Sequence, residues 1–285
     1  MKSQAFLSNQ KMIKFSRTPM LQFIKTGMQH RNLILKLIER EILGRYRGSL
    51  FGIFWSFLQP LLMLAVYTLV FSTVFKTRWP GIVDQGPIGF AINLFSGLIV
   101  FNLISECLTK APGLVLANPS YVKKVVFPLE VLGYVTVGCA LFHGLISILV
   151  LMVFQIIANG KISLTIWLLP ITWIPLLLLA LASTWIFSAM GVYVRDIGQA
   201  IGAFVSMLMF ISPIFFPLAA LPARWQSILA FNPIAPIIEQ TRAVTVLGQY
   251  PKLMYIFAGI SLGLMLCEIS YKFFMKAKRG FADVM

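Results

Sequence analysis

Residues 131–160 read VLGYVTVGCALFHGLISILVLMVFQIIANG, thirty consecutive positions without an aspartate, glutamate, lysine or arginine. A helix needs about 20 apolar residues to cross a bilayer, so this stretch is long enough to do so. Over the whole chain of 285 residues, 59% are hydrophobic and only 12% are charged. Because about a quarter of the residues in a soluble domain are charged, the sequence predicts an all-α membrane protein.

Other charge-free stretches of similar length flank this one. They cover 48–75, 85–105, 162–194, 197–223 and 253–271, the last interrupted only by Glu268. We therefore expect six spans, at about 50–75, 86–106, 131–157, 164–192, 197–219 and 252–273. They form a single transmembrane domain over residues 1–285, in which residues 1–30 are a cytoplasmic tail. Gly198 and Gly202 form a small-xxx-small pair that lets helices approach closely.

The formal net charge is +15, but the hydrophobic spans separate the positive residues, so they do not form one nucleic-acid-binding face. An even number of spans places both termini on the same side. If that side is cytoplasmic, its segments hold eighteen of the 24 lysines and arginines, and the opposite side holds six. This distribution follows the positive-inside rule, and it predicts that both termini are cytoplasmic.

The segment LILKLIEREILGRYR, residues 33–47, precedes the first span. At 100° per residue its apolar side chains share one half of a helix, and Lys36, Arg40 and Arg47 share the other. This pattern predicts an interfacial helix over 31–47, although a plain membrane anchor has the same pattern. Glu41 and Arg45 are four residues apart and are expected to pair.

A compact basic segment, ANPSYVKKVVFPLE, occupies residues 117–130. Asn118 suits an N-cap and Pro119 suits the first helical position. Pro128 then biases Phe127 away from the helix. We expect a short helix over 119–126 on the cytoplasmic side, which acts either as a docking element for a partner or as a turn that binds lipid headgroups.

A comparable arrangement follows the fifth span, at residues 220–251, ALPARWQSILAFNPIAPIIEQTRAVTVLGQYP. Pro222 can open one short helix, which carries Trp225, and Asn232-Pro233 can cap and start a second. Glu239 and Arg242 are three residues apart and can pair. Two half-buried helices here predict a re-entrant hairpin, which is either the external end of a pathway or a simple lid.

The spans lack the residues that most membrane enzymes and proton-driven transporters need at depth. His143 is the only ionisable residue in the middle of a span, and we expect it to be hydrogen-bonded inside the bundle because its own span has no acidic partner. A serine–histidine pair of Ser96 with His143 has no supporting pattern. The three cysteines have no metal-ligand spacing. We therefore predict no catalytic residue, metal or cofactor on this chain.

The sequence also contains no P-loop. Its only Gly-Lys pair, Gly160-Lys161, has Gln155 in place of the first glycine and Ile162 in place of the serine or threonine. If the protein moves a substrate uphill, a partner must supply the energy.

Together these features resemble a known family. The amphipathic helix before GRYRGSLFGIFWSFLQPLL, the segment NPSYVKKVVFP, VYVRDIGQ after the fourth span and the P-x-x-W and NP-x-x-P run at 222–236 are similar to permease subunits of bacterial polysaccharide ABC-2 exporters. The resemblance covers residues 30–275 and is greatest to the O-antigen (Wzm-type) permeases. Capsule and teichoic-acid permeases are close relatives.

The resemblance implies a homodimer in the bacterial inner membrane, joined to two copies of an ATPase subunit that binds ATP and magnesium. The expected cargo is a glycan on undecaprenyl pyrophosphate. A permease of the same fold for a small hydrophobic drug or a lipid, and a non-transporting scaffold or enzyme, are the alternatives.

The resemblance also assigns roles to particular residues. The ATPase-coupling helix at 118–127 includes Asn118, Pro119, Ser120, Tyr121, Lys123 and Lys124. The 31–47 helix is the cytoplasmic gate helix, where Arg40, Arg45 and Arg47 suit a pyrophosphate or, equally, phospholipid phosphates. Phe51, Phe54, Trp55 and Tyr67 are channel-lining candidates, with lipid-facing or core packing as the alternative. The periplasmic gate at 222–247 includes Arg224, Trp225, Asn232, Pro233, Glu239 and Arg242.

Overall fold

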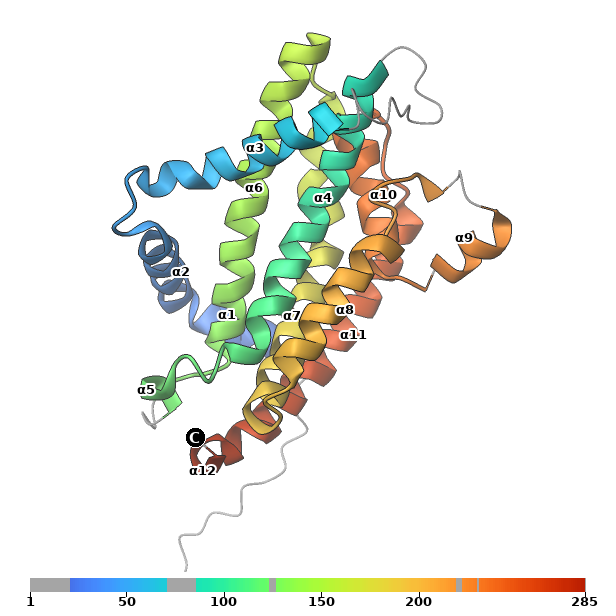
Figure 1. Cartoon of the computed structure of the whole chain (residues 1–285). Coiled ribbons are helices and arrows are strands. Elements are labelled where there is room, and N and C mark those ends of the chain that lie inside the picture. The colour runs from blue at the N-terminus through green and yellow to red at the C-terminus, as the bar shows by residue number, and fades with distance from the viewer. Residues whose placement is uncertain (1–20, 71–85, 123–126, 219–221, 230, 285) are drawn as a thin grey trace, which may run out of the picture.

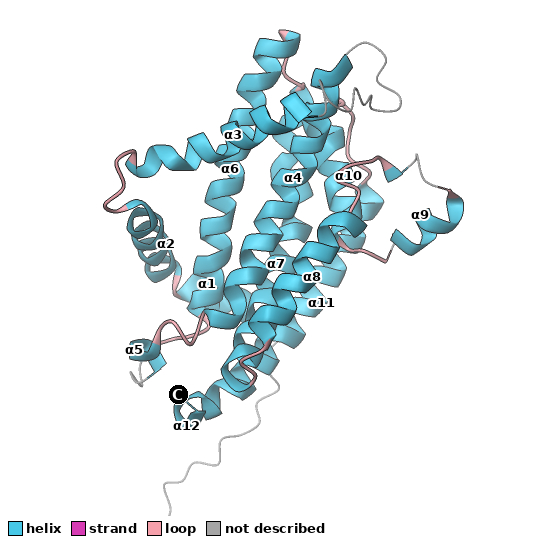
Figure 2. Ribbon diagram, viewed as in Figure 1, coloured by secondary structure: helices cyan, strands magenta, loops and turns pink. Residues whose placement is uncertain are grey.

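The computed structural model describes residues 21–70, 86–122, 127–218, 222–229 and 231–284, and every regular element in these ranges is helical (Figures 1 and 2). The helices are α1 Gln22–Gln29, α2 Arg31–Tyr46, α3 Trp55–Leu69, α4 Gly86–Lys110, α5 Pro119–Val122, α6 Val131–Asn159, α7 Leu169–Tyr193, α8 Ile197–Ile211, α9 Ala223–Leu229, α10 Ile234–Thr245, α11 Leu253–Ala277 and α12 Phe281–Val284. The all-α prediction is confirmed.

Five helical segments of the described chain are long and apolar enough to cross a membrane, so this is an integral membrane protein. They run over Gly52–Leu69, Ile88–Gly113, Val131–Ala158, Leu164–Tyr193 and Leu253–Val284. The expected fifth span, 197–219, corresponds to α8, which has only 15 residues. At 1.5 Å per residue it is about 22 Å long, short of a hydrocarbon core of about 30 Å. The helix ends at Ile211, two residues before Pro213, which has no N–H to donate to a helix.

The spans contribute unequally to the core. Of the apolar window in α4, 83% is buried, against 11% for the window that includes α3. In Figure 1, α4 lies inside the bundle between α6, α7 and α10, whereas α3 crosses α6 and α4 at a steep angle. The structure therefore has a bundle of α4, α6, α7, α10 and α11, and α3 lies at its edge.

The most extensive helix packing in the bundle joins α7 to α11. A Cβ atom added at Gly259 would lie 2.9 Å from the Pro175 Cβ, and one at Gly263 would lie 2.7 Å from the Leu178 Cβ. These glycines are four residues apart, so they form the small-xxx-small pair that packs within this chain. At Gly198 and Gly202, an added Cβ would meet no atom of the described chain within 4 Å.

Helices α1 and α2 precede the first span and lie against the bundle. The helix expected at 31–47 is observed as α2, whose residue Ile38 lies directly over Gly138 of α6, and its interfacial position remains a prediction. Helix α1 falls inside the segment assigned to a cytoplasmic tail. It is attached to the spans because Phe23 is buried, and because the Thr26 hydroxyl lies 2.8 Å from that of Tyr271.

The two short helices after α8 begin where the prolines predicted. Helix α9 follows Pro222, and α10 follows Pro233, where the Asn232 side-chain oxygen accepts a hydrogen bond from the Ile234 N–H at 3.0 Å. Helix α10 is largely buried, including Ile238 at 0% exposure, whereas α9 stands away from the bundle in Figure 1. The starts of the two helices are as predicted, and the re-entrant hairpin remains a prediction.

Candidate functional site

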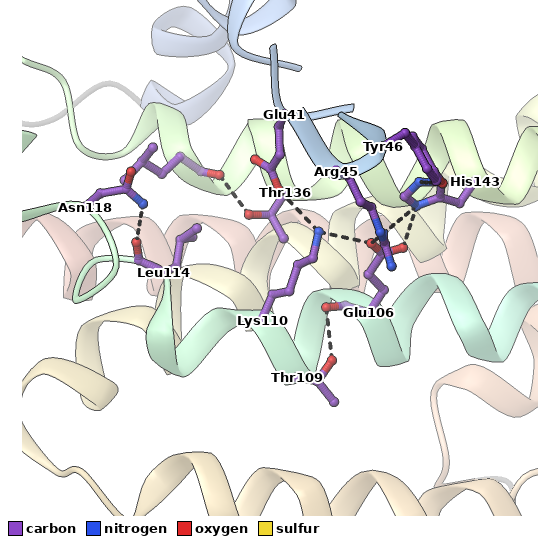
Figure 3. Close-up of polar contacts among 11 residues, drawn as sticks. Glu41, Arg45, Tyr46, Glu106, Thr109, Lys110, Leu114, Asn118, Thr136 and His143 are labelled. Atoms are coloured by element: carbon purple, nitrogen blue, oxygen red, sulfur yellow. Dashed lines mark hydrogen bonds and ion pairs between the residues drawn. The ribbon is translucent and has the colours of Figure 1, made fainter. Parts of the chain in front are cut away.

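A polar cluster connects α2 to two spans. It consists of Glu41, Arg45 and Tyr46 from α2, Glu106 and Lys110 from α4, and His143 from α6, and we call it the α2 cluster (Figure 3). These residues lie far apart in the sequence but meet because Ile38 and Gly138 bring α2 close to α6. In the part of the chain that the structure describes, no group of three or more histidine, cysteine, aspartate or glutamate side chains could hold a metal ion.

Glu106 is the centre of the α2 cluster. Its Oε1 lies 2.7 Å from Arg45 Nη1 and 3.0 Å from Lys110 Nζ, while its Oε2 lies 2.9 Å from His143 Nδ1. The side chain is only 17% exposed. A carboxylate at such a position needs charged or hydrogen-bonding partners to remain ionised, and it has three from three different helices.

The pairing of Glu41 differs from the expected one. Rather than contacting Arg45 along its own helix, Glu41 Oε1 accepts a bond from Lys110 Nζ at 3.2 Å. Arg45 instead donates to Glu106, because both α2 side chains reach opposite charges on α4. The i,i+4 prediction was therefore wrong in its partners. The two carboxylates and two cations of the cluster balance formally, so the charges on α2 are neutralised by the span and not by each other.

His143 has an acidic partner that its own span does not provide. Its Nδ1 faces Glu106, and its Nε2 lies 3.3 Å from the Tyr46 hydroxyl. Burial raises the pKa of the Tyr46 hydroxyl, so that group remains a proton donor. If Tyr46 donates to Nε2, then Nδ1 carries the ring proton and donates it to Glu106. The expected hydrogen bonding inside the bundle is confirmed. Ser96 donates instead to the Asn93 carbonyl, so it does not pair with this histidine.

A second contact connects α2 to the basic segment. Arg40 Nη2 donates to the Tyr121 hydroxyl at 2.6 Å, and its guanidinium carbon lies 5.8 Å from the centre of that ring. Tyr121 in turn stacks on Phe127, with ring centres 4.1 Å apart. Phe127 lies just before Pro128 and outside a helix, as expected. Its stacking on Tyr121 brings the two ends of the segment together.

The remaining residues of the basic segment lie around α5. Asn118 is half-buried and its amide donates to the Leu114 carbonyl at 2.9 Å, while Pro119 and Ser120 are exposed. The predicted helix begins at Pro119 and is described as far as Val122. Lys123 and Lys124 lie outside the described residues, so their role stays a prediction.

The aromatic candidates of the first span are mostly exposed. Phe51, Phe54 and Trp55 have exposed rings, and the rings of Phe51 and Trp55 meet edge to face at 5.6 Å. Tyr67 differs because it is half-buried and packs against the core. Arg47 is exposed just after α2. The structure thus offers an aromatic surface at the start of α3, beside the end of the gate-helix candidate.

A second polar cluster lies under α10 and is organised by Arg242. This side chain is 1% exposed. Its guanidinium donates to the Asn93 carbonyl on α4 at 3.2 Å, to the Pro213 carbonyl at 3.1 Å and to Glu239 at 2.9 Å. The expected Glu239–Arg242 pair is confirmed. Arg242 also binds carbonyls just beyond the end of α8, which have no helical N–H partner because α8 stops at Ile211.

The Arg242 guanidinium remains protonated although it is buried. Burial lowers its pKa to about 10, and the neighbouring Glu239 carboxylate opposes that shift. The side chain is thus cationic at neutral pH. Asn232 reinforces the same junction because its amide donates to the Ser212 hydroxyl at 3.0 Å. By contrast, Arg224 and Trp225 on α9 are exposed.

Sequence reasoning missed the partners that make these clusters. The sequence analysis assigned no partner to Glu106 or Lys110, although each lies at the end of an apolar span, where an unpaired charge is costly. This cost could have predicted that each of these charges has an oppositely charged partner nearby. The sequence did not show which helix would provide them.

Comparison with known proteins adds to this geometry. The family model described as ABC-2 type transporter matches residues 32–246. The chain is 25% identical over 259 residues to an O-antigen export system permease protein RfbA of Klebsiella pneumoniae, covering 89% of this chain and 95% of that protein. It is 24% identical to the protein of the same name from Myxococcus xanthus, covering 93% and 99%. It is 27% identical to a polysialic acid transport protein KpsM of Escherichia coli, covering 79% and 83%.

Proposed function

The chain belongs to the ABC-2 type transporter family, and we propose that it is the membrane-spanning permease subunit of an ATP-driven exporter of lipid-linked polysaccharide. The observation that carries this proposal is its similarity to O-antigen export permeases over nearly the full length of both chains. The most direct cargo is an O-antigen glycan on undecaprenyl pyrophosphate, moved from the cytoplasm to the periplasm across the inner membrane. Lipopolysaccharide assembly would then use the product.

A capsule polysaccharide is the second candidate cargo. It is favoured by the similarity to a polysialic acid transport protein, which covers 79% of this chain. The O-antigen reading is preferred because the match to those permeases extends further along both chains.

The proposed partner is a separate ATPase that docks on the segment at 118–127. The chain lacks a P-loop of its own, so ATP and magnesium would bind to that partner. Support comes from the contact between Tyr121 and Arg40, which gives a movement of the docking segment a direct route to α2. Two permeases and two ATPases would form the complete exporter.

In this proposal α2 acts as the cytoplasmic gate helix. A movement of the docking segment would pull on α2 through Arg40. It would then strain the ion pairs of the α2 cluster, where Arg45 and Glu41 hold α2 to α4. A gate needs two discrete arrangements with small differences in free energy. Partly exposed ion pairs suit this role because solvent compensates for their rupture far better than it does for a fully buried pair.

The cargo would enter beside the start of α3. Arg47 at the end of α2 suits its pyrophosphate, and the exposed rings of Phe51, Phe54 and Trp55 offer apolar faces for sugars. The exposed face of α3 would meet a second copy of the chain, so that the channel forms between two protomers.

At the other side, α9 and α10 would form the periplasmic gate. Arg242 anchors α10 to α4 and to the end of α8, whereas α9 with Arg224 and Trp225 stands free of that anchor. We expect α10 to remain fixed and α9 to move.

The experiment that tests this function is co-purification of the tagged chain with its candidate ATPase. Wild type is compared with Lys123→Glu/Lys124→Glu, and Lys276→Glu/Arg279→Glu near the C-terminal end serves as the matched charge-reversal control. We expect the ATPase to bind wild type and the control, and to be lost from the first variant along with surface glycan. Binding that is unchanged in all three proteins, or absent from all three, would remove the support for the coupling assignment.

A further inference from the structure

A cavity of about 740 Å³ is lined by α7, α10 and α11, and on another wall by Gln226 and Leu229 of α9 and by Phe231. Its size is in the range of ordinary ligand sites, about 300–1,000 Å³. Each helix contributes one stripe of side chains to the lining, among them Pro175 and Leu179 from α7, Gln240 from α10, and Tyr255, Ala258 and Leu262 from α11. Pro233 and Glu239, which were assigned above to the periplasmic gate, also line it, but none of the roles proposed above places a ligand in this cavity.

The cavity has an apolar part and a polar end. Pro175, Leu179 and Leu262 line it along the spans, while Gln240, Gln249 and Lys252 line it where α11 begins. From Lys252 to Leu262 the chain rises about 15 Å at 1.5 Å per residue. That length is half of a hydrocarbon core of about 30 Å. The lining therefore extends through the depth of one membrane leaflet.

The polar end also has the aromatic residues that mark a membrane interface. Phe231 and Tyr250 line the cavity and are 91% and 81% exposed, and Tyr255 follows at the first turn of α11. Tyrosine is enriched at the level of lipid headgroups. Exposed positions along α11, Tyr255, Ala258 and Leu262, open the apolar part sideways, toward the surrounding lipid.

The charge at the polar end selects the kind of headgroup. Glu239 lines the cavity, but its carboxylate is paired with Arg242 at 2.9 Å, so the pair is formally neutral. Lys252 is exposed and adds one positive charge. Its backbone N–H donates to Gln240 Oε1 at 2.6 Å, which fixes the rim beside it. The polar end is thus cationic overall and complements an anionic group.

We propose that this cavity binds one anionic phospholipid of the surrounding membrane, with its headgroup at Lys252 and an acyl chain along the surface where α7 and α11 meet, facing α10. An apolar void of this size in a membrane protein loses dispersion contacts if it stays empty, and a lipid chain restores them. The lipid would contact α10 at Gln240 and Ala243. Lipid binding at this site does not involve the exported cargo. A negative result for lipid binding would therefore leave the proposed export function untouched, and the reverse also holds.

The test measures lipid retained by the purified protein. The full chain is exchanged into vesicles of equal parts phosphatidylglycerol and phosphatidylcholine, extracted, and weighed intact by native mass spectrometry. Ala258→Trp and Leu262→Trp fill the cavity, and Lys252→Glu reverses its charge. Phe257→Trp is the matched control, because Phe257 is 64% exposed on the same helix and outside the lining.

Wild type and Phe257→Trp should each retain one phosphatidylglycerol, favoured about fivefold over phosphatidylcholine, the factor that about 1 kcal/mol per basic residue gives. The two cavity-filling variants should lose it, and Lys252→Glu should lose the preference while keeping a lipid. If one filling variant does not fold, the other and Lys252→Glu decide the result. Equal retention by filled and control variants overturns the proposal, and so does retention of only detergent, a polyprenyl lipid or a second copy of the chain.

Discussion

At the scale of single residues, Glu106 and Arg242 play equivalent parts at two ends of the bundle. Each side chain is mostly buried and receives or donates bonds to several helices at once. Glu106 holds α2 to α4, whereas Arg242 holds the buried helix α10 to α4 and to the end of α8. Removing either should affect the position of a whole element.

Glu106→Gln should loosen α2. The neutral amide cannot neutralise Arg45 and Lys110, and leaving such partners unsatisfied costs about 1–3 kcal/mol. Because Arg45 is 45% exposed, its share of that cost is reduced by solvent. We expect a lower melting temperature in detergent and faster proteolysis within α2. Glu39→Gln, an exposed carboxylate on α2, is the control, and equal behaviour of the two variants would contradict the assignment.

Arg242→Lys should fail to replace the arginine. A lysine ammonium is a point charge that does not bridge the Asn93, Pro213 and Glu239 acceptors together. The melting temperature and surface glycan should both fall, whereas Arg195→Lys, at an exposed arginine just before α8, should change neither. The folded-state pKa of Arg242, about 10, lies below its usual 12.5. Its charge therefore gives stability no pH dependence at pH 6–8. Between pH 10 and pH 12.5 the free energy of unfolding rises with pH, because the unfolded chain binds more protons there than the folded chain does.

At the scale of elements, the placement of α2 between the basic segment and the spans is central. The tight approach of Ile38 to Gly138 sets the distance between α2 and α6, and Arg40 sets the contact with Tyr121. A change at either contact should alter gating without unfolding the spans.

Gly138→Ala should displace α2, because the added Cβ would collide with the Ile38 side chain. Shortening that partner by Ile38→Ala removes the collision, so the double variant should recover the melting temperature and export lost by Gly138→Ala. A cysteine cross-linking assay between α2 and α6 reports the position directly. If the double variant is as defective as Gly138→Ala alone, the contact does not set the position of α2.

Tyr121→Phe should uncouple the ATPase from export. The variant keeps the stack on Phe127 but loses the hydroxyl that accepts from Arg40. A hydrogen bond of about 0.5–1.5 kcal/mol corresponds to roughly two- to twelvefold less export, measured as surface glycan at equal expression. The ATPase should still co-purify. Loss of ATPase binding instead would assign Tyr121 to docking rather than to transmission.

The sequence predicted those elements whose signals are local. Long charge-free runs gave the spans, and Pro119, Pro222 and Pro233 gave the starts of short helices. It did not predict ion pairs between different helices, such as Lys110 with Glu41. Spacing along the sequence does not show which of several opposite charges lies nearby in the folded chain. The length of α8 was overestimated because the charge-free stretch continues past Pro213, whereas the helix ends before that proline.

At the scale of the whole molecule, the spans differ in how much of their apolar surface the chain buries, and the span that includes α3 is the least buried of those that the structure describes. The core is complete around α4, yet α3 carries an apolar surface that this chain barely covers. In the proposed exporter, that surface meets a second copy and the ATPase meets α5. The anionic lipid would lie at α7 and α11.

The measurement that tests the central claim most directly is the fate of the glycan when the gene is deleted. Surface polysaccharide is stained on intact cells, and lipid-linked glycan is extracted from the same culture, with plasmid-borne wild type and Lys123→Glu/Lys124→Glu as complementing copies. The account predicts that deletion removes surface polysaccharide while lipid-linked glycan accumulates inside, and that only wild type restores export. Normal surface polysaccharide in the deletion strain would contradict it.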